Sequence, residues 1–359
     1  MRVEELRIEG LRNLVGVELR PSPGLNLLTG RNGAGKTSVL EALHLLAHGR
    51  SFRTAQLDGL VAHGRNTFSV FARLDSVTPP RLLGLARGPE GWQMAHDGSS
   101  VATLLDFVRG LAVVSIDPEC HALISGPAEA RRRFLDWLLF HVEPEFLPAW
   151  RRYLRALRQR NASLRAGASE RDVAVWEPEL AAAGETINRY RADLNGPLTQ
   201  ASREMLTQLR GELPDFTLRF RSGWPQGEPL LEALAAGRRA DRERGFTQRG
   251  PHRADWRLVF ESELDQRQLS RGQAKLIAVA CLAAQAEVYR DKTGTWPILA
   301  LDDLASELDV DRQQTVVSWA AGAGAQAFIT GTSVPAGWAG LNTERAMFHV
   351  EQGRLAPLV

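Results

Sequence analysis

Cysteine is scarce in this sequence of 359 residues, and long apolar runs are missing from it. Its two cysteines, Cys120 and Cys281, provide neither a disulfide framework nor a metal-binding cluster, which favours a reducing compartment. No apolar run approaches the roughly 18 residues of a membrane span. Acidic residues stand near the start, where a signal peptide would have its apolar core. We therefore expect a cytoplasmic protein with no membrane partner.

Lysine is scarce as well. It stands only at positions 36, 275 and 292, so arginine supplies almost all of the 44 basic residues. A compositional bias of the source genome explains most of this arginine. The net charge of +2 does not by itself indicate a nucleic-acid-binding protein, because such proteins usually carry a strong basic excess. The 44% apolar and 24% charged residues are typical of a globular chain, and the length allows two domains.

A glycine-rich motif, Gly-Arg-Asn-Gly-Ala-Gly-Lys-Thr, lies at residues 30–37. The apolar segment 25–29 before it predicts a buried strand, and helical spacing follows from Ser38 to Ala47. Glycines let backbone N–H groups converge on phosphate oxygens, while Lys36 reaches the β/γ-phosphates and Thr37 binds Mg²⁺. We expect Lys36 to act in catalysis as well as in binding. This context predicts an ATP or GTP site made by Gly30, Arg31, Asn32, Gly33, Ala34, Gly35, Lys36, Thr37 and Ser38.

A second motif consists of an apolar segment at 297–301 that is followed by Asp302 and Asp303. Such a segment predicts a strand of a parallel sheet that is covered on both faces. Asp302 fits a ligand of Mg²⁺, directly or through water. Asp303 is expected to be catalytic, because it would face the γ-phosphate and position or deprotonate the attacking water. Paired acids also occur at plain helix N-termini, so this pair indicates a magnesium site only because a buried strand precedes it and the chain also has the glycine-rich motif.

A third motif, made by Ser270, Gly272 and Gln273, precedes a helical pattern that extends to about Tyr289. Its hydroxyl, N–H groups and helix N-terminus suit a γ-phosphate. With the acid pair and the Ser-x-Leu-Asp sequence at 306–309, it follows the order of ATP-binding-cassette folds, where this turn serves the P-loop of a partner subunit. We therefore expect Ser270 to be catalytic across a dimer. By itself the turn is also an ordinary helix cap.

Together with these motifs, five further segments make the chain similar to a known family. They are residues 6–14, 49–54, 117–119, 131–136 and 250–253. The chain resembles the RecF family of bacterial recombination-repair ATPases, which are related to Rad50 and SMC heads, over nearly its full length. Ala254 departs from the family, which has an acid there, and leaves Asp255 as the candidate acid. Cys120 and His121 replace the more usual Asp-Leu.

The expected fold is an α/β ATP-binding-cassette-type P-loop ATPase head with an inserted, mostly helical lobe. Residues 1–125 form the N-terminal part of the ATPase lobe, 126–250 the insertion and 251–359 the C-terminal part. Helical spacing across the insertion predicts an all-helical lobe of two or three antiparallel helices. The insertion is too short for the extended coiled coil of an SMC protein.

The resemblance implies an ATP-dependent homodimer that clamps duplex DNA near single-strand gaps and promotes RecA loading with a RecR-like mediator. It implies a weak ATPase that acts as a timer, with ATP and Mg²⁺ as cofactors, and Arg12 near the nucleotide. The alternative is a nucleotide-switched protein-interaction module that does not touch DNA. A transporter ATPase is a weaker alternative, because the predicted strand 328–332 lacks a switch histidine and offers Thr330 or Thr332 near the γ-phosphate instead.

Clustered arginines are the candidate DNA contacts, because guanidinium groups bind the phosphate backbone without reading sequence. One cluster comprises Arg131, Arg132 and Arg133, and the other is a row on a predicted helix made by Arg151, Arg155 and Arg158. The alternative for the first cluster is a solvated helical face with Glu129 and Asp136 as partners. The nine tryptophans lie mostly in apolar patterns, so we expect them to pack in the core.

Overall fold

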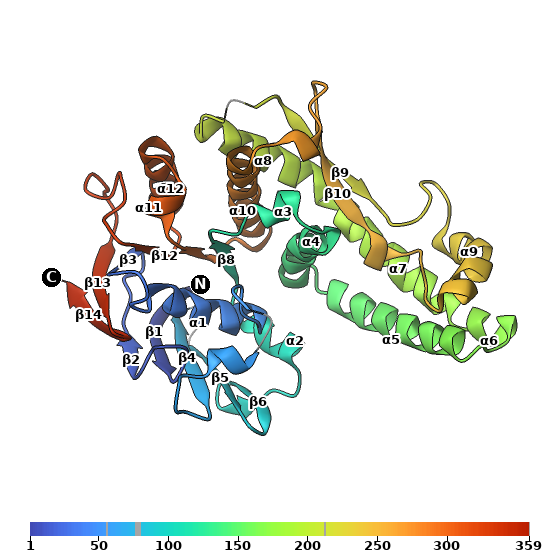
Figure 1. The fold of residues 1–359 in the computed structure, drawn as a ribbon, viewed down its shortest axis with the longest axis horizontal. Helices are drawn as coiled ribbons and strands as arrows, with labels where there is room; N and C mark the ends of the chain where they lie inside the picture. Colours follow the sequence, from blue (N-terminus) through green and yellow to red (C-terminus); the bar gives the residue numbers. More distant parts are fainter. Residues whose placement is uncertain (55–56, 76–79, 212, 359) are drawn as a thin grey trace. The chain divides into compact units, whose positions relative to one another are not determined.

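The computed structural model describes residues 1–54, 57–75, 80–211 and 213–358 (Figure 1). Its internal contacts divide the chain into two compact units. Unit 1 is made of Met1–Cys120, Thr207–Arg210 and Gln285–Val359, and unit 2 of His121–Leu206 and Gly211–Ala284. Both ends of the chain therefore build unit 1, and the middle of the chain builds unit 2. No helix in the described ranges is both long and apolar enough to cross a lipid bilayer.

A mostly parallel sheet carries the predicted motifs of unit 1. Its strand order is β14-β13-β3-β12-β11-β8, and β14 alone among these runs antiparallel to its neighbour. The strands are β3 (Leu25–Thr29), β8 (Val113–Ile116), β11 (Ile298–Leu301), β12 (Ala327–Gly331), β13 (Arg345–Glu351) and β14 (Arg354–Leu358). Every residue of β11 and β12 is buried, which explains the apolar runs in the sequence. The predicted strands at 25–29 and 297–301 are confirmed.

An antiparallel sheet forms the rest of the unit 1 framework, in the order β2-β1-β4-β5-β6-β7. Its strands are β1 (Arg2–Glu9), β2 (Val17–Leu19), β4 (Phe68–Asp75), β5 (Arg81–Gly88), β6 (Gly91–His96) and β7 (Ser99–Ser100). Buried and exposed residues alternate along β4, as is typical of a half-buried strand. Leu6 of β1 and Leu28 of β3 belong to one apolar core that also includes most of the helix α1 (Lys36–His48).

Both units contain further helices. Those of unit 1 are η1 (Leu57–Leu60), α2 (Leu104–Phe107), η2 (Val108–Gly110), α11 (Leu304–Glu307) and α12 (Val310–Ala323). Those of unit 2 are α3 (Ala122–Ser125), α4 (Ala128–Val142), α5 (Phe146–Arg165), α6 (Glu170–Ala174), α7 (Glu177–Asp193), α9 (Leu230–Arg244), η3 (Pro251–Arg253) and η4 (Gln266–Gln268). The helices α8 (Asn195–Gln208) and α10 (Arg271–Thr293) begin in unit 2 and end in residues of unit 1.

Unit 2 is not all-helical, and this corrects the expectation for the insertion. The strand β9 (Phe216–Arg221) pairs along its whole length with β10 (Asp255–Phe260). Buried Phe216 and Leu218 alternate with exposed residues, which is the period of a strand and not of a helix. Because β10 follows residue 250, this pairing also explains why unit 2 extends past the expected boundary. The described insertion contains α4 to α9 instead of two or three helices.

A buried ion-pair cluster joins three helices of unit 2. Arg160 of α5 is fully buried and donates to Glu177 of α7 at 3.0 Å and to Asp241 of α9 at 2.7 Å. Its third partner is the Thr247 hydroxyl, at 2.8 Å. Charges this deep are tolerated only when each is paired and hydrogen-bonded. Arg160 therefore belongs to the core of unit 2 and not to its surface.

Candidate nucleotide-binding site

The glycine-rich loop leaves β3 and enters α1 through backbone conformations that favour glycine. Gly30 has φ +152°, and a Cβ there would lie 2.2 Å from the Val350 carbonyl oxygen. Gly35 has φ +118°, and its Cβ would meet Leu14 at 2.8 Å. A side chain at either position would be strained and would collide with the strand or turn beside it. The loop therefore keeps the curled form that the phosphate-binding motif requires.

The Lys36 side chain folds back over this loop. Its ammonium group donates to the carbonyl oxygens of Gly30, at 2.8 Å, and Arg31, at 3.0 Å. Burial lowers the pKa of Lys36, while the neighbouring carboxylates of Asp303 and Asp302 act in the opposite direction. The ammonium group thus lies on the loop carbonyls, and its contact with phosphate stays a prediction.

The predicted magnesium ligands lie in direct contact. The Thr37 hydroxyl, at the start of α1, donates to Asp302 Oδ1 at 2.8 Å. Asp302 follows β11, and its backbone N–H donates to the Ile116 carbonyl of the adjacent β8. Burial raises the pKa of Asp302, and hydrogen bonds from Thr330 and Thr37 lower it in part. The carboxylate is therefore held in one position at an energetic cost that a bound cation would offset.

The Thr330 side chain binds the acid pair, whereas the sequence suggested that its hydroxyl would lie near a γ-phosphate. Its hydroxyl donates to Asp302 Oδ1 at 2.7 Å and accepts the Asp303 N–H at 2.8 Å. Thr330 is buried at the end of β12, so both hydrogen-bonding directions of its hydroxyl are used inside the protein. Asp303 has φ +50°, a left-handed conformation that residues other than glycine adopt only uncommonly.

Two residues that the sequence analysis did not single out, Asn13 and Glu41, connect the turn after β1 to the loop and to α1. The Asn13 amide donates to the Gly33 carbonyl at 2.9 Å and accepts from the Ser38 hydroxyl at 3.2 Å. Glu41 of α1 is buried and accepts Arg12 through both carboxylate oxygens, at 2.9 and 2.8 Å. Asn13 stood in the family-like segment 6–14, which was the available signal. Glu41 had none.

Arg12 itself is anchored. Besides Glu41, it donates to the Gly59 carbonyl at 2.6 Å, and its φ of +57° fixes the turn. The structure therefore places Arg12 beside the loop as part of a rigid support, and its contact with a nucleotide stays a prediction.

The third motif belongs to unit 2 and forms a capping box at the start of α10. Ser270 N–H donates to the Gln273 side chain at 2.9 Å, and Gln273 N–H donates to the Ser270 hydroxyl at 3.2 Å. Ser270 and Gly272 are exposed. The motif is thus an ordered, accessible helix N-terminus, and its role opposite a partner's P-loop stays a prediction.

The structure corrects the prediction that the first arginine cluster contacts DNA. Arg131 is only 7% exposed and donates to Asp255 at 2.7 Å and to the Gly126 carbonyl at 2.8 Å. Arg132 donates to the Ala254 carbonyl at 2.9 Å, and burial lowers its pKa. The expectation that Arg131 contacts DNA is therefore wrong, because its donors are used to join α4 to β10.

The other arginines that were predicted to contact DNA are exposed. Arg133 pairs with Glu129 on the surface of α4, as the alternative interpretation of that cluster proposed. Arg151, Arg155 and Arg158 lie exposed along α5. This row keeps its status as a predicted DNA contact.

Comparison with known proteins agrees with this geometry. The family model described as "RecF/RecN/SMC N terminal domain" matches residues 2–79. The chain is 48% identical over 361 residues to "DNA replication and repair protein RecF" of Stenotrophomonas maltophilia, with 99% of each chain covered. The chain belongs to the RecF family. A RecF of Chromohalobacter salexigens is 40% identical over 368 residues, with 99% of each chain covered.

Solved structures share the fold. "Structure of the recombination mediator protein RecF-ATPrS in RecFOR pathway" matches with a TM-score of 0.86 at 25% identity, covering 100% of this chain and 98% of that one. An Smc head domain bound to the C-winged helix domain of ScpA matches with a TM-score of 0.59 at 12% identity, covering 100% and 98%. The chain thus has the α/β ATP-binding-cassette-type head of RecF and SMC proteins.

Proposed function

We propose that this RecF-family chain binds ATP with Mg²⁺ at the loop of residues 30–38. The hydrogen bond between Thr37 and Asp302 carries the proposal, because it brings together a hydroxyl and a carboxylate that suit Mg²⁺. Within the described residues no cluster of three or more His, Cys, Asp or Glu side chains could hold a metal by itself. Phosphate oxygens would therefore complete the coordination, as is usual for this ion. Lys36 would turn from the loop carbonyls to the β/γ-phosphates.

Hydrolysis would depend on Asp303. Burial lowers the pKa of Lys36, and the Asp303 carboxylate is the stronger of the two charges that oppose this shift. The γ-phosphate would bind between these two side chains. Asp303 would orient the attacking water and accept its proton. Such a site suits a slow ATPase in which hydrolysis times the release of a bound state.

ATP would also join two chains. Ser270, Gly272 and Gln273 of one chain would complete the loop of the other, using the exposed N–H groups at the start of α10. The closed dimer would clamp duplex DNA near single-strand gaps, with Arg151, Arg155 and Arg158 as phosphate contacts. It would promote RecA loading together with a RecR-like mediator.

Fluorescence anisotropy with gapped duplex DNA, with and without ATP and Mg²⁺ and across a salt series, tests the proposal. We expect binding that requires ATP and weakens steeply with salt. Protein that dimerises with ATP and binds no DNA would instead favour a nucleotide-switched module for a protein partner.

A further inference from the structure

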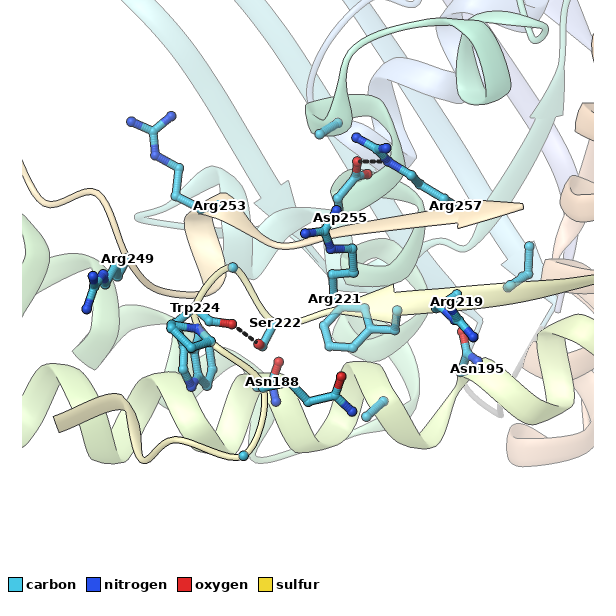
Figure 2. Close-up of a pocket in the computed structure, with 18 of the residues that line it drawn as sticks. Asn188, Asn195, Arg219, Arg221, Ser222, Trp224, Arg249, Arg253, Asp255 and Arg257 are labelled. Atoms are coloured by element: carbon cyan, nitrogen blue, oxygen red, sulfur yellow. Dashed lines mark hydrogen bonds and ion pairs between the residues drawn. The ribbon is translucent and has the colours of Figure 1, made fainter. Parts of the chain in front are cut away.

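A groove of about 1560 Å³ lies within unit 2, between the β9–β10 ribbon and α7 (Figure 2). It exceeds the roughly 300–1000 Å³ of typical small-molecule pockets. Arginines from the ribbon line one wall, Asn188 of α7 lines the other, and the loop that carries Trp224 closes one end. A groove of this volume suits part of a polymer better than a small ligand.

The exposed face of the ribbon carries an arrangement of charge that is unfavourable in the protein alone. Arg219 lies directly opposite Arg257 in the register of the ribbon, and both are exposed. Side chains in such positions have their Cβ atoms about 4.5–5.5 Å apart, and like charges there are destabilising. The opposite face, with Phe216 and Leu258, is buried, so the register cannot shift to separate the two charges.

Acidic residues nearby do not neutralise these arginines. Arg219 and Arg221 have no ion pair with any residue that the structure describes. Arg257 reaches Asp255 only at 3.6 Å, and Asp255 is already bound to Arg131 at 2.7 Å. An anion that enters the groove would therefore relieve the repulsion on the ribbon.

The spacing of the charges fits a chain of phosphates. Arg219 and Arg221 are two residues apart on a strand, which places them about 6.8 Å from each other, comparable to neighbouring phosphates of an extended nucleic-acid strand. Arg253, which precedes β10, also lines the groove, but its guanidinium lies over the Phe246 ring at 5.4 Å and is not part of this row. Guanidinium groups bind phosphate oxygens through paired N–H donors, whatever the base sequence.

The aromatic and amide groups in the groove suit unpaired bases. The Trp224 indole is partly exposed and is fixed by a hydrogen bond from Nε1 to the Glu228 carbonyl at 3.0 Å. The Asn188 side chain lines the same groove, although its Oδ1 is itself buried and has no hydrogen-bond partner in the described part of the chain. Since the groove has a wall on each side, bases can reach these groups only when they are not paired in a duplex.

We propose that this groove binds a single strand of DNA through its phosphates, with Arg219, Arg221 and Arg257 as contacts and Trp224 as a stacking surface. The inference rests on the proposed function in one respect, namely that the chain meets DNA. It adds a site for the unpaired strand, distinct from the duplex contacts proposed on α5.

Anisotropy of a labelled oligothymidine and of a duplex of equal length tests the groove in the full chain. We expect the double variant Arg219→Gln/Arg257→Gln to weaken oligothymidine binding at least about tenfold and to reduce the salt slope by about 1.4, at about 0.7 for each phosphate contact. The control Arg239→Gln/Arg244→Gln removes the same charge from the exposed surface of α9 and is expected to bind as wild type.

Two further measurements separate binding from folding. The groove variant is expected to unfold at the same or a higher temperature than wild type, because its like-charge pair is gone. Trp224→Ala is expected to weaken oligothymidine binding about tenfold, and Trp224→Phe is expected to restore most of it.

Four results would overturn the groove site. Equal losses in the groove and control variants would indicate a general effect of charge, and a loss of duplex binding alone would indicate a duplex contact. Groove-dependent binding of polyglutamate without DNA binding would indicate an acidic protein partner. ATP-dependent duplex binding by wild type that shows no affinity for oligothymidine would remove the groove site and leave the proposed function intact.

Discussion

Replacing Thr330 by valine removes a buried hydroxyl that joins both acids of the nucleotide site. The side chains are nearly isosteric, so the change tests hydrogen bonding and not packing. Asp302 would lose a donor at 2.7 Å, and the Asp303 N–H would lose its acceptor at 2.8 Å. Leaving the Asp303 N–H unpaired costs about 1–3 kcal/mol, whereas Asp302 Oδ1 keeps the Thr37 hydroxyl at 2.8 Å and loses one hydrogen bond of about 1 kcal/mol, so we expect a destabilisation of about 2–4 kcal/mol.

The same change has a predictable effect on ATP binding. The Thr330 hydrogen bond lowers the pKa of Asp302, which burial has raised. Without that bond the pKa rises further, so Mg²⁺-dependent ATP binding should fail at a higher pH than in wild type as the solution is acidified. With Asp303 no longer fixed through its backbone, we expect hydrolysis to fall at least about tenfold.

Denaturant unfolding, ATP titration across pH and phosphate release measure these effects on Thr330→Val and Thr330→Ser. Serine keeps the hydroxyl and is expected to stay close to wild type. A valine variant that unfolds and hydrolyses ATP as wild type does would refute the supporting role of Thr330.

Four further changes test other parts of the structure. Asp302→Asn should abolish Mg²⁺-dependent ATP binding yet raise the melting temperature of the nucleotide-free protein at neutral pH. The raised pKa means that the charged form is penalised in the fold, so this gain should vanish at acid pH, where the carboxyl is protonated in both states. Ser270→Arg should leave ATP binding intact and prevent ATP-dependent dimers in sedimentation analysis; surviving dimers would exclude the shared site. Asp303→Asn should give persistent ATP-bound dimers, and unaltered phosphate release would remove its catalytic assignment. Arg160→Met should destabilise unit 2 by about 3–5 kcal/mol in chemical denaturation, because it leaves the buried Asp241 carboxylate without its arginine partner, whereas Glu177 keeps Arg238 at 2.6 Å; ATP binding in unit 1 should be retained.

The fold of unit 1 was predictable because its central strands are apolar throughout. The segment 25–29 is β3 without any change, and the segment 297–301 is β11 except for its first residue. The strand β9 was missed because six alternating residues stand between helical patterns, and a short period of two is easily hidden there. Only pairing with β10, which lies more than thirty residues away in sequence, makes this segment a strand.

The residues of the nucleotide site likewise include some that the sequence indicated and some that it did not. The loop and the acid pair are contiguous motifs, so the sequence indicated each of them together with its chemistry. Asn13, Glu41 and Thr330 come from three separate elements and reach the site only when the sheets of unit 1 form. No spacing along the chain records such contacts, because they depend on which strands become neighbours.

The arginines show why the nucleic-acid contacts were harder to predict than the nucleotide site. Arg131, Arg132 and Arg133 are adjacent in sequence, but successive residues of a helix point in different directions, so one is buried and the others have separate partners. Arg219 and Arg257 are far apart in sequence, and a strand register places them side by side. The exposed arginines of the β9–β10 ribbon are therefore brought together by pairing between strands, and a count of neighbouring arginines in the sequence does not find them. The same reasoning makes the β9–β10 ribbon a better place than α4 to look for contact with DNA.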